Sequence, residues 1–365
     1  MTTTSMTTEE EIEGLGTEAD DATVSGYPID TLLIRNENRT VHNVLRRIAQ
    51  GSFIMNPDFQ RDFIWPVDKQ SKLIESVLMR IPLPVFYLGE DDEGHMIVVD
   101  GLQRLSTFQR FVNNEFALTL PAQAELDKKL FKDLPPKMQN RIEDCNLILY
   151  IIDAKVPDQA RLDIFDRVNG GVALTRQQMR NCLYMGPATR FLKDEAESEL
   201  FKEATGNSIE YRTMRDRELV NRFCAFHLLP LEDYKGNMDV FLAAALKKMN
   251  KLPPGDLAKL STQFHTSLAN NIALFARHAF RKHTDGKTTR SVFNAALWDV
   301  MTTTLANHSE TAVQAHASPL NQAFHDLMAD SKFISAITSG PNNQKSVLYR
   351  FNATKTAFQE VFNVK

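Results

Sequence analysis

Residues 96–112, MIVVDGLQRLSTFQRFV, pass from a strand to a helix with almost no connecting chain. Met96 to Val99 predict a short apolar strand, and Asp100-Gly101 interrupts it. Apolar residues then recur at helical spacing, at Leu102, Leu105, Phe108 and Val112. The fold must therefore place a helix start directly at the end of a strand. The first turn of this helix carries Gln103 and Arg104, two side chains that can form several hydrogen bonds each.

A helix start of this kind can bind an anion. The first backbone N–H groups of a helix have no partner within the helix, and the helix dipole is positive at that end. Gly101 leaves room for a ligand, and Arg104 could hold a phosphate through two parallel hydrogen bonds. Gln103 could orient an oxygen atom or a water molecule. Asp100 has two candidate roles, as the cap of the helix or as a contact to a metal, a ribose or an attacking water.

The same residues also fit a purely structural interpretation. In this alternative Asp100 is the helix N-cap, Gly101 is a turn residue, and Gln103 and Arg104 face solvent. The stretch alone does not separate the two interpretations.

Two further polar groups bear on the site. Gln60-Arg61 is a second Gln-Arg pair, in a loop-like stretch before Trp65, and binding groups concentrate on loops. Arg167 precedes the turn Asn169-Gly170-Gly171, which could add polar contacts, although a turn connecting two helices explains it about as well.

The organisation of the chain predicts an α+β protein. We expect an acidic disordered tail over residues 1–28, a mixed α/β domain over 29–155 and an α-helical domain over 156–365. Strands are predicted over Ile29–Ile34, Val85–Leu88, His95–Val99 and Leu147–Ile152. Helices are predicted over Val41–Ala49, from Pro66 to near Arg80, Arg176–Tyr184, Asp216–His227, Met238–Met249, Leu257–Phe280, Val292–Leu305, Leu320–Met328 and Val347–Val361.

Composition and charge narrow the functional classes. Apolar residues make up 43% of the chain, no run of 18 apolar residues occurs, and the three cysteines form no CxxC pair, so we expect a cytoplasmic protein with reduced thiols. Residues 1–30 contain eight acidic and no basic residues, which leaves 42 basic against 38 acidic residues in the remainder. That balance is compatible with DNA contact but does not argue for it.

Five stretches in order resemble one known family. They are NPDFQRDFIW, LIESVLMRIPLPVFYL, VVDGLQRLSTF, FDRVNGGVALTRQQMRN and RDRELVNRFCAF. Together they resemble the N-terminal domain of GmrSD-type modification-dependent restriction endonucleases, over about residues 30 to 360. The resemblance implies a ParB/sulfiredoxin-like fold that binds and often hydrolyses a nucleotide, with the signature Asp-Gly-Gln-Gln-Arg, in bacterial defence against phage DNA.

The resemblance also implies roles for individual residues. Asp100, Gly101, Gln103 and Arg104 would form the nucleotide-phosphate site, with Asp100, Gln103 and Arg104 as catalytic residues. Gln60, Arg61, Arg167 and Asn169 would be further nucleotide-binding residues. Leu102 departs from the signature, because the family usually has its first glutamine there. If that amide orients the attacking water, this protein binds nucleotide but turns it over slowly.

The expected ligand is an NTP of unknown base, with Mg²⁺ as its companion. DNA and a separate nuclease subunit are candidate partners, and assembly into an oligomer stays open. The nine histidines show no cluster typical of an HNH nuclease, and the sequence lacks G-x-x-x-x-G-K-[ST]. Three functions follow: an NTP-hydrolysing component of DNA restriction, a non-catalytic nucleotide- or DNA-binding module that recruits a nuclease, and a DNA phosphodiesterase. Leu102 favours the second over the first, and the near-neutral charge weakens the third.

Overall fold

A computed structural model describes residues 12–15, 34–55, 65–91, 93–168, 175–283 and 289–363. Its contacts divide the chain into two compact units. One, here the sheet unit, spans Gly26–Leu183, and the other, the helical unit, combines Met1–Ser25 with Tyr184–Lys365. The chain is therefore α+β, with a small mixed sheet before a helical region, as the sequence predicts. The division falls later than the boundary expected after residue 155, because two helices beyond that point pack on the sheet.

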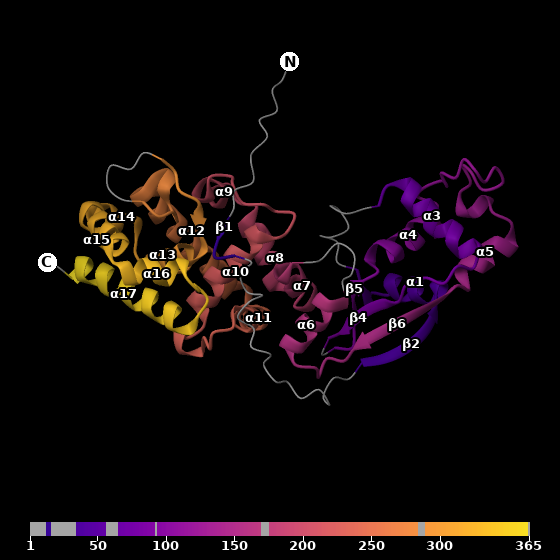
Figure 1. Ribbon diagram of the computed structural model, residues 1–365, viewed down its shortest axis with the longest axis horizontal. Coiled ribbons are helices and arrows are strands. Elements are labelled where there is room, and N and C mark those ends of the chain that lie inside the picture. The colour runs from indigo at the N-terminus through magenta and orange to yellow at the C-terminus, as the bar shows by residue number, and fades with distance from the viewer. Residues whose placement is uncertain are drawn as a thin grey trace, which may run out of the picture. The chain divides into compact units, whose positions relative to one another are not determined.

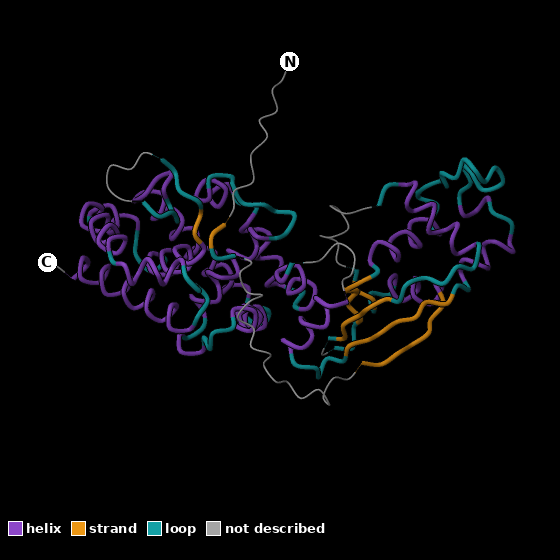
Figure 2. The backbone as a smooth tube through the Cα atoms, in the orientation of Figure 1, coloured by secondary structure: helices purple, strands orange, loops and turns teal. Residues whose placement is uncertain are grey.

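The sheet unit is built on a five-stranded mixed sheet in the order β2-β6-β4-β5-β3 (Figure 2). The strands are β2 (Ile34–Thr40), β3 (Phe53–Ile54), β4 (Phe86–Glu90), β5 (Met96–Asp100) and β6 (Asn146–Ile152). β4 is parallel to β6 and antiparallel to β5, with Tyr87 opposite Asp100. The last residue of β5 thus lies beside the start of β4.

Four helices cover one face of this sheet: α1 (Val41–Ala49), α3 (Val67–Leu78), α4 (Leu102–Val112) and α5 (Pro136–Glu143) (Figure 1). The helix predicted from Pro66 to near Arg80 is confirmed as α3, and its residues Leu73, Ile74, Val77 and Leu78 are all buried. These residues join Phe108 and Phe111 of α4 and alternate strand residues in one hydrophobic core.

Two helices, α6 (Asp158–Val168) and α7 (Arg176–Leu183), pack on β4 and β5. Ile97 and Val99, which alternate with the core residues of β5, are also buried. A capping box opens α7, the helix predicted from Arg176. Thr175 N–H donates to Oε1 of Gln178 (2.7 Å), and Gln178 N–H donates to Oγ1 of Thr175 (3.2 Å).

The helical unit contains α8 (Pro187–Ala196), α9 (Glu199–Thr205), α10 (Arg215–Leu228), α11 (Met238–Met249), α12 (Pro254–Phe275), α13 (Ala295–Leu305), α14 (Glu310–Ala315), α15 (Ala317–Ala329), α16 (Ser331–Thr338) and α17 (Gln344–Asn363). The prediction for α11 is confirmed at both ends. The helix predicted to reach Phe280 is wrong at its end, because α12 stops at Phe275 and Ala276 takes a φ of 45°. In the described part of the chain, no helix combines the length and apolarity needed to cross a membrane.

A buried ionic cluster lies inside the helical unit, where the side chains of Arg222, Asp299 and Arg350 have no exposed surface. Asp299 accepts two hydrogen bonds from Arg222 (2.8 and 2.7 Å) and one from Arg350 (2.9 Å). Burial lowers the pKa of Arg350, and the charge of Asp299 opposes this shift. One carboxylate therefore neutralises part of the charge of two buried guanidinium groups. Arg222 of the stretch RDRELVNRFCAF thus contributes to the core of the helical unit.

The tail predicted to be disordered over residues 1–28 is ordered in part. β1 (Ile12–Glu13) pairs in parallel with β7 (Phe293–Asn294) of the helical unit, and Ile12 and Leu15 are buried. The carboxylate of Glu13 accepts hydrogen bonds from Lys282 (2.9 Å) and Asn294 (3.0 Å). The two apolar side chains and the edge of β7 hold this acidic segment, so its charge alone was a poor guide to order.

Candidate functional site

The junction between β5 and α4 depends on Gly101. Its φ of 98° lies in the left-handed region, which side chains disfavour. A Cβ atom at this position would lie 2.2 Å from Cδ1 of Phe86 on the neighbouring strand. Glycine therefore allows the chain to turn sharply over the Phe86 ring and start a helix at once.

The start of α4 has no side-chain cap. Gly101 is its N-cap residue, and the first backbone hydrogen bond runs from Leu105 N–H to the Gly101 carbonyl (2.9 Å). Within the described residues, no hydrogen bond reaches the N–H groups of Leu102, Gln103 and Arg104. The interpretation of Asp100 as the helix cap is therefore wrong, and these three adjacent donors suit an anion.

Arg104 is buried, with 8% of its surface exposed, and its guanidinium group connects three parts of the unit. Nη2 donates to Oδ2 of Asp100 (2.7 Å) and to the Val85 carbonyl (3.1 Å), and Nη1 donates to the Pro84 carbonyl. The group also lies over the Phe86 ring, with Cζ 4.2 Å from the ring centroid. The alternative in which Arg104 faces solvent is wrong. Burial lowers the pKa of Arg104, and the charge of Asp100 opposes this shift.

These contacts change what Arg104 can do for a ligand. Among the described residues, Asp100 is its one ionised acceptor, and the carboxylate side chain of Asp100 is still 30% exposed. A phosphate arriving at the start of α4 would compete with Asp100 for the guanidinium group. The two carbonyl bonds would meanwhile keep Arg104 attached to the segment that leads into β4.

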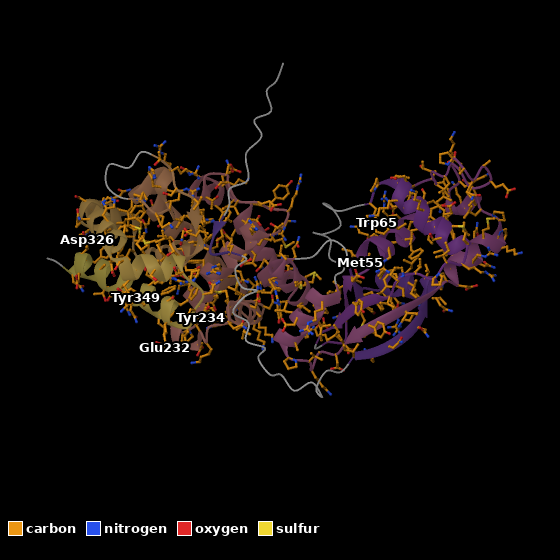
Figure 3. All side chains as sticks on the ribbon, in the orientation of Figure 1. Met55, Trp65, Glu232, Tyr234, Asp326 and Tyr349 are labelled. Carbon is orange, nitrogen blue, oxygen red and sulfur yellow. The ribbon has the colours of Figure 1, made fainter. Side chains whose placement is uncertain are left out.

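Gln103 connects α4 to the start of α3. Its Oε1 accepts a hydrogen bond from the backbone N–H of Trp65 (3.0 Å), and the Trp65 carbonyl accepts one from Nε2 of Gln70 (2.5 Å). Lys69 Nζ lies 4.5 Å from the centre of the Trp65 ring, which Figure 3 labels. Gln103 therefore fixes the chain directly after the stretch that carries the second Gln-Arg pair.

Three of the predicted site residues, Gln60, Arg61 and Asn169, lie outside the described residues. Arg167 is exposed on the last turn of α6, and the described residues form no hydrogen bond with it. The structure thus brings together Asp100, Gly101, Gln103 and Arg104, and it leaves the expected roles of the other four as predictions.

A buried polar cluster on α7 was not among the predicted site residues. Gln177, Arg180 and Asn181 are each at most 1% exposed, and α7 packs on β5. Arg180 donates from Nε to Oε1 of Gln177 (3.0 Å), whose Nε2 donates to Asn181 (2.9 Å). The signal was the density of polar residues in TRQQMRN, which surface exposure would explain equally well.

The described residues contain no group of three His, Cys, Asp or Glu side chains that could hold a metal ion. Asp100 is a single carboxylate and already contacts Arg104. The Mg²⁺ ion expected as the companion of an NTP stays a prediction.

The sheet unit is an α+β domain in which a strand, a left-handed glycine and an uncapped helix start form a potential anion site. Residues 41–185 match the family model described as GmrSD restriction endonuclease, N-terminal domain. This match supports the GmrSD-type restriction endonuclease N-terminal domain family and suggests a component of a restriction or phage-defence system. The match is shorter than the resemblance expected over residues 30 to 360. No curated protein matches the chain.

Proposed function

We propose that the sheet unit binds the phosphate groups of a nucleotide at the start of α4 and serves as the nucleotide-binding component of a DNA restriction system. The observation that carries this proposal is the set of N–H groups at residues 102–104, which no described residue engages and which lie directly beside the guanidinium group of Arg104. Backbone donors and a buried cation together favour a phosphate over a neutral ligand. The match to the GmrSD N-terminal domain supports the setting in DNA restriction.

The contacts of Gln103 favour binding over rapid hydrolysis. Its Oε1 already accepts the Trp65 N–H, so this amide supports the fold at that atom. Leu102, where the family signature has a second amide, is half-buried and packs against the core. Among the described residues, the site therefore has few polar groups left to orient an attacking water. In this proposal the chain senses a nucleotide and a separate nuclease subunit cuts DNA.

Replacing Arg104 by alanine should weaken nucleotide binding by about 1.5–3 kcal/mol, the usual range for a charged hydrogen-bond partner. Arg104→Lys should restore little, because lysine cannot bridge Asp100, a phosphate and two carbonyls. Calorimetry with each of the four NTPs and Mg²⁺ measures the effect.

Arg110→Ala is the matched control, because Arg110 lies on the same helix and contacts Gln70 and Glu115 instead. Circular dichroism must show that Arg104→Ala is folded, since the change removes two bonds to carbonyls. Equal nucleotide affinity in a folded Arg104→Ala variant would rule out the site at α4.

Replacing Leu102 by glutamine should raise NTP hydrolysis without tightening binding, if the added amide acts only in the transition state. Leu102 is half-buried, so the polar side chain can point outward at modest cost to stability. Phosphate release is measured at saturating NTP in both proteins. A folded variant no faster than the original chain contradicts the role given to this position.

A further inference from the structure

The sheet unit has a second candidate site, a pocket of about 520 Å³ at the C-terminal end of α3. It lies between that end of α3, one face of α5 and the start of β6. The lining residues are Val77, Arg80, Ile81, Pro82, Leu83, Lys137, Asn140, Arg141, Asp144, Cys145 and Asn146. No residue of the predicted α4 site is among them.

The sequence explains why a hollow forms here. α3 stops at Leu78, Arg80 takes a left-handed φ of 61°, and Pro82 and Pro84 cannot extend a helix. After α3 the chain therefore continues without helical structure, and residues 80–83 form one wall of the pocket. Arg141 of α5 donates from Nη1 to the Leu78 carbonyl (2.8 Å), which fastens α5 to the end of α3.

The charge of the pocket is positive. Lys137, Asn140 and Arg141 are spaced as one face of α5, and Asp144 follows directly after its last residue. All four line the hollow. Arg80 adds a cation from the opposite wall. The lining thus holds three cations against one carboxylate, an excess that suits a ligand carrying about two negative charges.

Apart from Arg80, the wall opposite α5 is apolar. It consists of Val77, Ile81, Pro82 and Leu83, and Ile81 keeps 48% of its surface exposed. An inorganic anion would make no contact with this apolar wall. The volume of the pocket also suits a larger molecule. The combination fits a ligand with a phosphate at one end and a flat or apolar group at the other.

We propose that this pocket binds one nucleotide unit, either as a free nucleotide or within a DNA strand. The cations of Lys137, Arg141 and Arg80 receive the phosphate, since guanidinium and ammonium groups together suit its oxygen atoms. The apolar wall receives the sugar and one face of the base. Asn140 and Asn146 supply amides for the polar edges of the base or sugar. This assignment does not depend on nucleotide binding at α4.

Cys145 gives a direct readout, because its half-buried thiol lines the pocket, whereas Cys182 and Cys224 are buried in the core. Burial raises the pKa of Cys145, so alkylation by iodoacetamide should be followed at mildly alkaline pH. Mass spectrometry of the Cys145 peptide reports its rate in the full chain. A ligand in the pocket slows the reaction by a factor of 1 + [L]/Kd, about fivefold at four times Kd.

The probes are ATP, a short duplex DNA, a short single-stranded DNA and inorganic phosphate. We expect protection by ATP, by DNA or by both, and this pattern separates the free nucleotide from the strand. Lys137→Glu should lower the affinity for the protecting ligand by about tenfold or more, since it reverses a charge beside the phosphate. Lys72→Glu, an exposed lysine of α3 outside the pocket, should keep protection.

Three results would overturn the assignment: no protection by ATP or DNA, equal protection in Lys137→Glu, or protection by phosphate at the concentrations where ATP protects. The α4 site is judged separately, by calorimetry on Arg104→Ala. If Cys145 protection persists while folded Arg104→Ala binds nucleotide with the same affinity as the original chain, the α4 proposal is refuted and the pocket proposal stands.

Discussion

Replacing Asp299 by asparagine is expected to lower the free energy of unfolding of the helical unit by about 3–5 kcal/mol. Arg222 and Arg350 both bind this carboxylate, and none of the three side chains is exposed. Asparagine keeps the volume but removes the charge, so the buried guanidinium groups of Arg222 and Arg350 each lose the ion pair with this carboxylate. One amide oxygen also replaces two strong acceptors.

Urea unfolding followed by tryptophan fluorescence measures this effect in a Trp65→Phe background, where Trp298 is the remaining reporter. Trp298 is buried in the helical unit and donates to the Leu219 carbonyl (2.8 Å). Asp256→Asn, an exposed aspartate in the first turn of α12, is the control and should change stability by less than about 1 kcal/mol. A similarly small change in Asp299→Asn would contradict the importance of the ionic cluster.

Replacing Gly101 by alanine should destabilise the sheet unit by about 2–4 kcal/mol and abolish binding at α4. Part of this cost is the left-handed backbone, about 1–2 kcal/mol, and the rest is the collision of Cβ with the Phe86 ring. The ring cannot simply withdraw, because Phe86 is fully buried under Arg104.

Gly94→Ala separates the two costs. Gly94 has a similar φ of 82°, but no described atom would lie within 4 Å of an alanine Cβ at that position, so only the backbone cost should appear. Hydrogen exchange of peptides from β4, β5 and α4 gives the local stability in both variants. If Gly101→Ala costs no more than Gly94→Ala, the close packing on Phe86 is not what requires glycine.

Residues close together in sequence predicted the local fold well. The apolar spacing of α3, the capping box of α7 and the strand-to-helix junction at Gly101 each depend on neighbours within a few positions. Backbone geometry and side-chain spacing at this range are nearly fixed by residue type. The chemical elements of the candidate site were therefore visible in one short stretch.

Contacts between distant segments were not predictable in the same way. Arg104 reads as a free cation in the sequence, but its acceptors include carbonyls 19 and 20 residues earlier. Residues 29–33 of the strand predicted over Ile29–Ile34 lie outside the described residues. The sequence did not predict β2, which starts at Ile34 and is a polar edge strand with alternating exposure. Pairing with β6 and the bond of Arg35 to Glu90 hold β2, and neither leaves an apolar pattern in its sequence.

The pairing of β1 with β7 fixes when the N-terminal segment can fold during synthesis. Glu13 and Asn294 are 281 residues apart, so at about 5–20 residues per second the ribosome needs about 15–60 s to deliver the second partner after the first. Gly26–Leu183 can assemble during that time, since its contacts are its own. Ile12 and Leu15 cannot be buried until β7 has been synthesised. This acidic segment therefore joins the helical unit late in folding. A bulky protein fused close before Ile12 would therefore be expected to slow the pairing of β1 with β7.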